Sequence, residues 1–321
     1  DMLERGTWWK MFQDPELDYL IAQVNVNNQN IASAVALYRE ALATMDQNTA
    51  NYWPTVDLAL DVSRQKVATD LYGLNTQSTL FNTYEINPTV TWMPDIFGAV
   101  RRAVEAAQAG AQATEAQLAE TRLAMQALLA QTYFQLRAAD LTQKLLDDTV
   151  DAYRRDLVLT KNKYAAGIVS QLDVTQAETS LESAQTAALD NGITRAQSEH
   201  AIAVLIGKFP ENFAVLKAED YHQNVPYVPL ELTSKLLERR SDVASAERLV
   251  AQANAEIGIA VAAYFPVLTL TSNYGYSSSY FKHLFSTPTN MWSIGAALIE
   301  TIFDGGARAA QVRLARATYD Q

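Results

Sequence analysis

Few side chains in this 321-residue sequence have the types and spacing that chemistry requires. The chain has no cysteine, which excludes a thiol nucleophile, a disulfide and a cysteine metal site. The three histidines, His200, His222 and His283, are scattered and lack the spacing of metal ligands. We find no nucleophile–base set, and the pair Gly305-Gly306 alone is not a phosphate-binding motif. The residues therefore predict no enzyme, no cofactor and no metal site.

Two groups of charged residues are better explained by helix structure than by ligand binding. The first has the spacing at which opposite charges pair on a helix surface or cap the helix, and it comprises Glu238, Arg239, Arg240, Asp242 and Glu247. In the second, Asp304 stands directly before two glycines. We expect Asp304 to cap a helix rather than to bind an ion.

A further set of polar residues alternates along two predicted strands, and it consists of Asp57, Asp61, Glu85 and Thr89. If these strands form a barrel, the period of two turns this set toward the lumen. The net charge of −11 argues against nucleic acid as a partner and fits an acidic surface or an acidic lumen that favours cations.

The elements that carry this polar set are two predicted β-hairpins. The first spans 52–97, with strands at 56–63 and 84–92 and a loop at 64–83, and the second spans 264–303, with a loop at 277–290. Each strand of the first hairpin is long enough to cross a bilayer as a tilted strand. The alternation predicts one lipid-facing set: Val56, Leu58, Leu60, Ile86, Val90, Leu268 and Leu270. Aromatic residues near strand ends should mark the membrane interfaces, namely Trp92, Tyr274, Tyr276 and Trp292.

Helical patterns fill most of the remaining chain. A helix at 14–49 begins with an Asp-Pro cap signal, and a second runs from 99 to 164 with Gly110 as its only glycine. The second helix would be roughly 100 Å long, a length that favours a coiled coil over a plain core stripe in a bundle. Further helices are predicted at 170–206 and from about 232 to 263. No window has the 18 apolar residues of a transmembrane helix.

A tight reversal joins the long helix to the helix at 170–206. Gly167 is placed just past the helix end, and Ser170 with Asp173 has the spacing of a capping box. An exposed tip with small residues lets a partner approach the backbone, so we expect a docking point at Gly167, Ile168, Val169, Ser170 and Asp173. The alternative interpretation is that Gly167 serves the turn alone, and both can hold.

The chain contains an internal duplication. Tyr52-Trp53-Pro54 matches Tyr264-Phe265-Pro266, and Ile96-Phe97-Gly98 matches Ile302-Phe303 with the glycines that follow. We predict a first repeat at 1–206, composed of helix, hairpin, long helix, tip and helix. A connector follows at 207–233, and then a truncated second repeat at 234–321 that ends at the start of its long helix.

Four strands are too few to close a barrel, and an open sheet would leave two edges exposed. Oligomerisation is therefore implied, although these residues do not give the number of copies. A hypothesis from another class is a soluble coiled-coil scaffold, in which the apolar strand faces pack against helices. Solubility of the natural protein without detergent would favour the scaffold.

Several stretches in this order resemble the outer-membrane efflux protein family, the TolC/OprM superfamily, and within it the OprM-like factors of tripartite drug efflux pumps. They are Trp8-Trp9 with Phe12 and Asp14-Pro15; 92–102; Ala166-Gly167 with Ser170, Leu172 and Asp173; Leu205-Ile206-Gly207 with Pro210; 237–243 with Ala246-Glu247; 253–258; and 302–306. The sequence departs from the usual family pattern at Pro94, Ser241 and Thr301. The lipidated cysteine common in this branch is not in the chain, so lipidation stays open.

The resemblance implies an α+β membrane protein that forms a homotrimer. Each chain would contribute four strands to a 12-stranded outer-membrane β-barrel and long helical hairpins to a periplasmic tunnel. It also implies passive multidrug efflux, with the energy supplied by an inner-membrane pump through a periplasmic adaptor protein. Family members meet their adaptors at a tip of the kind seen at 167–170, whereas their gate residues lie mainly in a second hairpin that this chain lacks.

Overall fold

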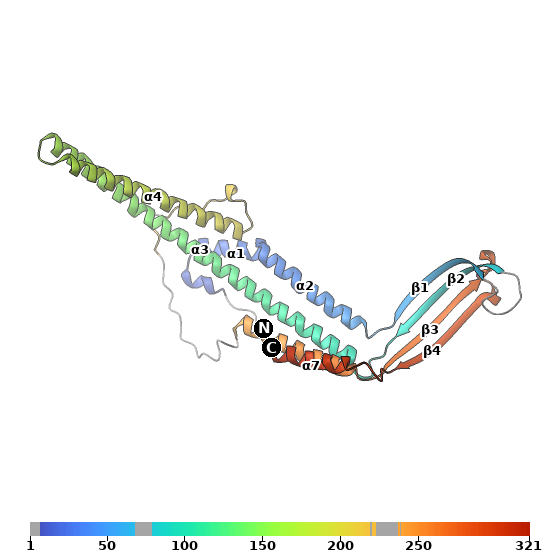
Figure 1. Ribbon diagram of the computed structural model, residues 1–321. Helices are drawn as coiled ribbons and strands as arrows, with labels where there is room; N and C mark the ends of the chain where they lie inside the picture. The colour runs from blue at the N-terminus through green and yellow to red at the C-terminus, as the bar shows by residue number, and fades with distance from the viewer. Residues whose placement is uncertain (1–6, 68–78, 219, 223–236, 238) are drawn as a thin grey trace. The chain divides into compact units, whose positions relative to one another are not determined.

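The computed structural model describes residues 7–67, 79–218, 220–222, 237 and 239–321. Its contacts divide the chain into two compact units, one formed by 1–38 with 115–244 and the other by 39–114 with 245–321. Three helices contribute to both units: α2 (Gln29–Ala50), α3 (Ala99–Ala165) and α6 (Ser241–Ala262). Figure 1 labels α2 and α3. The predicted repeats are continuous stretches of sequence, whereas each compact unit combines two separate stretches. The units therefore do not test the repeat boundaries, which stay a prediction.

The first unit is a helical body around an apolar core. The 3-10 helix η1 (Trp8–Phe12) and α1 (Pro15–Asn27) pack with the second half of α3 and with α4 (Gln171–Leu205). The fully buried side chains include Leu17, Leu20, Ile21, Leu129, Leu136 and Ile202. The aromatic residues of η1 pack against this core and thereby fix η1 to the helical body.

The helix predicted over 14–49 is wrong at one point, because the structure divides it at Asn28 into α1 and α2. Asn28 adopts an extended backbone conformation, and its Oδ1 accepts hydrogen bonds from the N–H groups of Asn30 and Ile31. Its Nδ2 donates to the carbonyl of Leu205 at 2.8 Å, and the residue is buried. Asn28 therefore ends one helix, caps the next and ties both to the end of α4.

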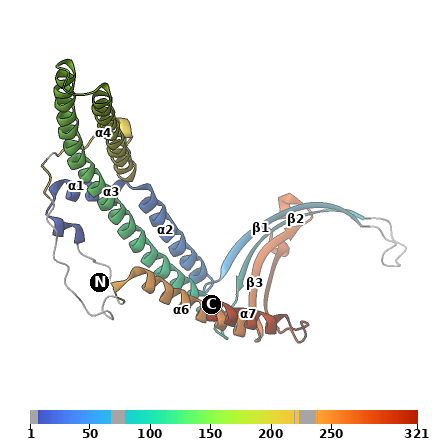
Figure 2. The same ribbon diagram turned by 60° about the vertical axis from the view of Figure 1, so that its left-hand side comes forward.

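The second unit contains one antiparallel sheet in the order β1-β2-β3-β4. Its strands are β1 (Thr55–Val67), β2 (Thr79–Trp92), β3 (Val267–Ser278) and β4 (Asn290–Ile299). The predicted loops at 64–83 and 277–290 were too long. In the first hairpin, pairing continues through Arg64↔Asn82 and Lys66↔Leu80, and residues 68–78 lie outside the described part of the chain. In the second hairpin, β3 extends to Ser278 and β4 begins at Asn290. Figure 2 shows that the sheet is bowed along its strands.

Most of α6, which leads to β3, and all of α7 (Ala307–Asp320), which follows β4, complete the second unit. The predicted start of α6 near residue 232 lies partly outside the described residues, as does the connector beyond residue 222. Among the described residues, no helix combines the length and the apolar character needed to cross a membrane.

Candidate functional site: a two-faced sheet, a helical tip and a buried polar network

The register of the sheet brings the predicted apolar residues to one face. Val56 pairs with Val90, Val90 with Ser272, and Ser272 with Ile294. Paired residues in an antiparallel sheet share a face, so even-numbered positions share one face in all four strands. That face carries every residue of the predicted lipid-facing set, together with Val62, Pro88, Ile294 and Leu298.

The opposite face holds the predicted lumen-facing residues. Asp57 pairs with Thr89, and Asp61 pairs with Glu85, so the structure brings these four side chains together on the odd-numbered face. Asn273, which pairs with both Thr89 and Ser293, extends this polar face across the sheet. The sheet therefore has one apolar and one polar side, with acidic groups on the polar side.

The described residues leave the apolar side of β1 largely uncovered. Val56, Leu58 and Leu60 are 69%, 64% and 72% exposed. In β2 and β3 the corresponding residues Ile86, Val90, Leu268 and Leu270 are half-buried, since these strands have neighbours on both sides. A face this apolar requires a partner, either lipid or protein.

Aromatic residues lie at both ends of the strands. At the helix-proximal end, the indole N–H of Trp92 donates to the carbonyl of Tyr52 at 3.0 Å. At the distal end, Tyr84 stands against Phe281 and Tyr276 against Phe285, with ring centroids 5.7 and 5.5 Å apart. Tyr274 and Trp292 pair with each other between these ends.

Short joints connect the strands to the helices that follow them. After β2, the carboxylate of Asp95 accepts hydrogen bonds from the N–H groups of Val100 and Arg101 at the start of α3. After β4, the carboxylate of Asp304 accepts from the N–H groups of Gly306 and Arg308 and from the Arg308 side chain, as expected for a cap. Hydrogen bonds from Arg308 lower the pKa of Asp304 to about 2.

The helical tip has the local structure predicted for it. Gly167 has a φ of +74°, and the N–H of Ile168 donates to the carbonyl of Lys163 at 2.9 Å, which is the pattern of a Schellman motif. Ser170 and Asp173 form the predicted capping box, and hydrogen bonds from Ser170 lower the pKa of Asp173. Ile168 is 71% exposed, whereas Val169 is half-buried.

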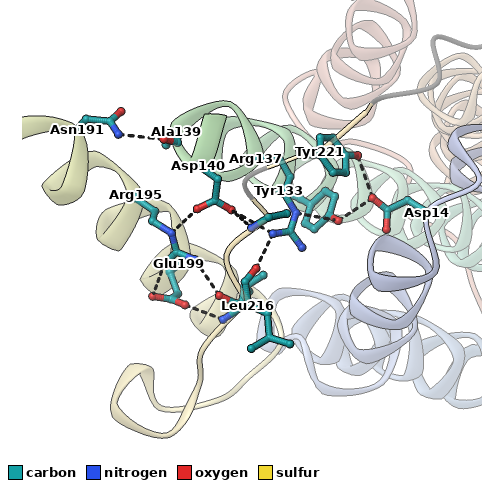
Figure 3. A network of polar contacts seen from close by, with 12 residues as sticks. Asp14, Tyr133, Arg137, Ala139, Asp140, Asn191, Arg195, Glu199, Leu216 and Tyr221 are labelled. Atoms are coloured by element: carbon teal, nitrogen blue, oxygen red, sulfur yellow. Dashed lines mark hydrogen bonds and ion pairs between the residues drawn. The ribbon is translucent and has the colours of Figure 1, made fainter. Parts of the chain in front are cut away.

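A network of buried charges, which was not predicted, lies in the first unit (Figure 3). Asp140, whose side chain is 1% exposed, accepts from Nε of Arg195 at 2.6 Å and from Nη1 of Arg137 at 3.1 Å. Arg195 also pairs with Glu199 at 3.2 Å. The Arg137 and Arg195 side chains are only 8% and 11% exposed, so the network consists of paired charges that water scarcely reaches.

This network holds the chain segment that follows α4. Arg195 and Arg137 donate to the carbonyls of Val215 and Leu216, and the N–H of Val215 donates to Glu199 at 2.6 Å. Asp140 accepts from the N–H of Ala218. The described part of the connector is therefore fastened to α3 and α4 by its backbone.

Asp14 connects the network to the start of α1. Its Oδ1 caps α1, as predicted, and its Oδ2 accepts from the hydroxyls of Tyr133 and Tyr221 at 2.6 and 2.9 Å. Burial and the hydrogen bond to Asp14 raise the pKa of Tyr221 to about 12, and the same two causes raise the pKa of Tyr133. Nε of Arg137 donates to the Tyr133 hydroxyl, which completes the link to Asp140.

One signal in the sequence pointed to this network. Arg137 and Asp140 interrupt the apolar stripe of α3 at a spacing of three, immediately after Leu136. Charged residues are almost never buried unless they are paired, so a pair within an apolar stripe indicates a buried ion pair. The partners Arg195 and Glu199 could not be identified, because they lie on another helix.

Comparison with known proteins agrees with this geometry. A sequence model of the family described as "Outer membrane efflux protein" matches residues 20–208 and 232–321. The chain is 32% identical over 306 residues to the probable efflux pump outer membrane protein TtgC of Pseudomonas putida, and 28% identical over 319 residues to the outer membrane protein OprJ of Pseudomonas aeruginosa. These alignments cover 95% and 97% of this chain and 63% and 66% of the two relatives.

Solved structures show the same fold. The outer-membrane channel OprN superposes with a TM-score of 0.89 at 28% sequence identity, and the match covers 98% of this chain and 70% of OprN. The open state of the MtrE outer membrane channel of Neisseria gonorrhoeae superposes with a TM-score of 0.81 at 27% identity, covering 95% of this chain and 68% of MtrE. The chain thus spans about two thirds of the length of the proteins that it matches.

Proposed function

The chain belongs to the outer membrane efflux protein family, and from this premise we propose that it is the exit channel of a tripartite efflux system in the bacterial outer membrane. Three copies would each contribute four strands to a 12-stranded barrel, and their helices would form a tunnel in the periplasm. Small molecules would leave passively, with energy supplied by an inner-membrane pump through a periplasmic adaptor. The named relatives are transport proteins rather than enzymes.

One observation carries this proposal: the separation of apolar and polar residues onto opposite faces of a sheet with two free edges. The exposed apolar residues on the even-numbered face would contact outer-membrane lipid. Asp57, Asp61, Glu85 and Thr89 would then line the lumen. Packing of this apolar face on helices, as a soluble scaffold requires, does not match the exposure of Val56, Leu58 and Leu60.

The helical tip would be the docking point for the adaptor. It is a closed turn with its own capping box and an exposed Ile168. Added bulk at Gly167 would meet no neighbouring atom within 4 Å, so the backbone there is open to a partner. This role rests on the exposure of the turn and on the family to which the chain belongs.

The function is tested by expressing the full-length protein in cells that keep the matching pump and adaptor but lack their own exit channel. We expect it to restore expulsion of a fluorescent dye, and the purified protein to conduct ions across planar bilayers with a preference for cations. Replacing Asp57, Asp61 and Glu85 by their amides should lower that preference, because it removes negative charge from the lumen. A protein that stays in solution without detergent and conducts no ions would contradict the proposal.

A further inference from the structure

The two edge strands of the sheet, β1 and β4, are suited to pair with a second copy of this chain. Within the part of the chain that the structure describes, β1 and β4 each pair on one side only. The residues that flank them are also uncovered: Trp53 before β1 is 73% exposed, and Ile302 and Phe303 after β4 are 94% and 88% exposed. A strand edge with unpaired backbone groups beside exposed aromatic rings is a template for another strand.

The internal duplication provides a model for what covers these edges. In the middle of the sheet, β2 of the first repeat pairs with β3 of the second, with Trp92 opposite Leu270. Beside this ladder, the ring of Phe97 stacks on that of Phe265, with centroids 5.1 Å apart and an interplanar angle of 10°. The junction between the two repeats is thus a paired ladder and one aromatic stack.

The two free edges carry residues equivalent to those of this junction, but each in the other repeat. Phe303 occupies the position of Phe97 in its repeat, and Trp53 occupies that of Phe265. The two joints also agree in structure, because a glycine of positive φ precedes the helix in each, Gly98 at +83° and Gly306 at +90°. An aspartate carboxylate caps the helix in both joints.

The proposed 12-stranded barrel already requires β4 of one copy to pair with β1 of the next. We infer that this pairing takes the register of the β2–β3 junction and that Phe303 stacks on Trp53 of the second copy. This inference rests on the proposed function and specifies how its subunits join. Counting from the matched motifs of the two repeats identifies the equivalent positions. Leu298 is equivalent to Trp92, because each lies four residues before the matched isoleucine, Ile302 or Ile96. Leu58 is equivalent to Leu270, because each lies four residues after the matched proline, Pro54 or Pro266.

The register follows from these equivalences. Leu298 stands opposite Leu58 of the second copy, as Trp92 stands opposite Leu270. One step along the antiparallel ladder, Ala297 stands opposite Ala59 of the second copy, and further along Ile294 stands opposite its Val62. Even-numbered residues meet even-numbered residues, so the apolar face continues without interruption across the boundary between copies.

A ring of three copies in this register has the strand tilt of a membrane barrel. The observed pairings lead from Val56 through Val90 and Ser272 to Ile294, and the inferred pairing then reaches Val62 of the next copy, six residues further along β1. Three such steps around twelve strands give a total stagger of 18 residues. With about 3.3 Å per residue and 4.8 Å between strands, the tilt is about 46°, close to the ~45° of transmembrane strands.

Disulfide scanning tests the register, and the chain has no cysteine to confuse the result. The full-length protein carrying Ala59→Cys and Ala297→Cys is purified in detergent and treated with a mild oxidant. We expect covalent dimers and trimers on a denaturing gel, which the reductant returns to monomers. The matched controls replace Ala59→Cys by Asp57→Cys or Asp61→Cys, each two residues out of register, and we expect these to form at least several-fold less covalent product.

A second measurement tests the aromatic contact. The half-time of trimer dissociation at raised temperature should fall several-fold in both Phe303→Ala and Trp53→Ala. The half-time of the double variant should be no shorter than that of the less stable single variant, because each single substitution already removes the stack. Independent, multiplying effects would overturn the stacking of Phe303 on Trp53.

The outcomes separate this inference from the proposed function. A trimer that conducts ions but crosslinks better through Asp57→Cys or Asp61→Cys overturns the inferred register and leaves the channel in place. A protein that forms no oligomer and no conducting channel overturns both. Crosslinking through Ala59→Cys and Ala297→Cys in a conducting trimer supports both.

Discussion

Asp140 is the residue on which the buried network depends most. Its carboxylate receives hydrogen bonds from the buried Arg137, from the largely buried Arg195 and from the backbone of the connector. Replacing it by alanine leaves two desolvated cations without their shared anion, and breaking such buried pairs costs about 3–5 kcal/mol. We therefore expect Asp140→Ala to lower the free energy of unfolding by about 3 kcal/mol or more in denaturant titrations of the purified protein.

The control for this prediction is Asp151→Ala, which removes the partner of Arg154 in an ion pair whose two side chains are 58% and 59% exposed. Exposed pairs contribute about 0–1 kcal/mol, because water screens them. Equal effects of the two substitutions would show that Asp140 is not part of a desolvated network.

Ionisation of Tyr221 should lower the stability of the helical body at alkaline pH. Its pKa in the folded chain is raised to about 12 from an ordinary value of 10. Because the folded value is the higher one, the stabilisation is complete below pH 10 and is lost as the pH rises from 10 to about 12. Alkaline unfolding, followed by circular dichroism, should be less steep over that range for Tyr221→Phe.

The matching control is Tyr19→Phe, which changes an exposed tyrosine of the same unit and should leave the steepness unchanged. If Tyr221→Phe and the parent lose helix with the same slope, the raised pKa of Tyr221 does not contribute to stability.

At the scale of the elements, the two faces of β1 should respond oppositely to charge. Arginine at Leu60, on the apolar face near the middle of the strand, should destabilise the assembled protein by about 2–4 kcal/mol because its cation would enter lipid. Arginine at the neighbouring Asp61 would enter the lumen and should be tolerated. Heat resistance of the two trimers on gels is the measurement, and a Leu60→Arg trimer as resistant as the parent would refute the lipid-facing assignment.

Elements whose signals are local were predictable from the sequence, and elements that depend on distant contacts were not. The cap at Asp14 and the capping box at Ser170 use neighbouring residues, and the strand faces follow from a period of two. The break at Asn28 depends on the carbonyl of Leu205, which belongs to another helix. The strand ends were misplaced because pairing, rather than alternation of polarity, extends β1 to Val67 and begins β2 at Thr79.

At the scale of the whole molecule, the docking role proposed for the helical tip predicts that the tip binds an adaptor without supporting assembly of the protein itself. Ile168 is exposed and belongs to neither α3 nor α4. We expect Ile168→Gln to assemble as the parent does, while crosslinking to the adaptor and dye efflux fall at least several-fold. Leu189→Gln, which changes a side chain of α4 that is 72% exposed, serves as the control and should keep both activities. Normal efflux and normal adaptor crosslinking by Ile168→Gln would refute the docking role.

The even–odd division of the sheet restricts how strand lengths in this chain can change. Inserting or deleting one residue within a strand exchanges the faces of all residues beyond it. In the proposed barrel, acidic side chains would then turn toward lipid and leucines toward the pore. Changes of two residues, or changes in the joints outside the ladder, keep both faces intact. The second joint has two more residues than the first between its phenylalanine and its helix, and these lie beyond the end of β4. A longer joint does not change which face each strand residue occupies. The joints are therefore where this architecture can gain or lose residues one at a time.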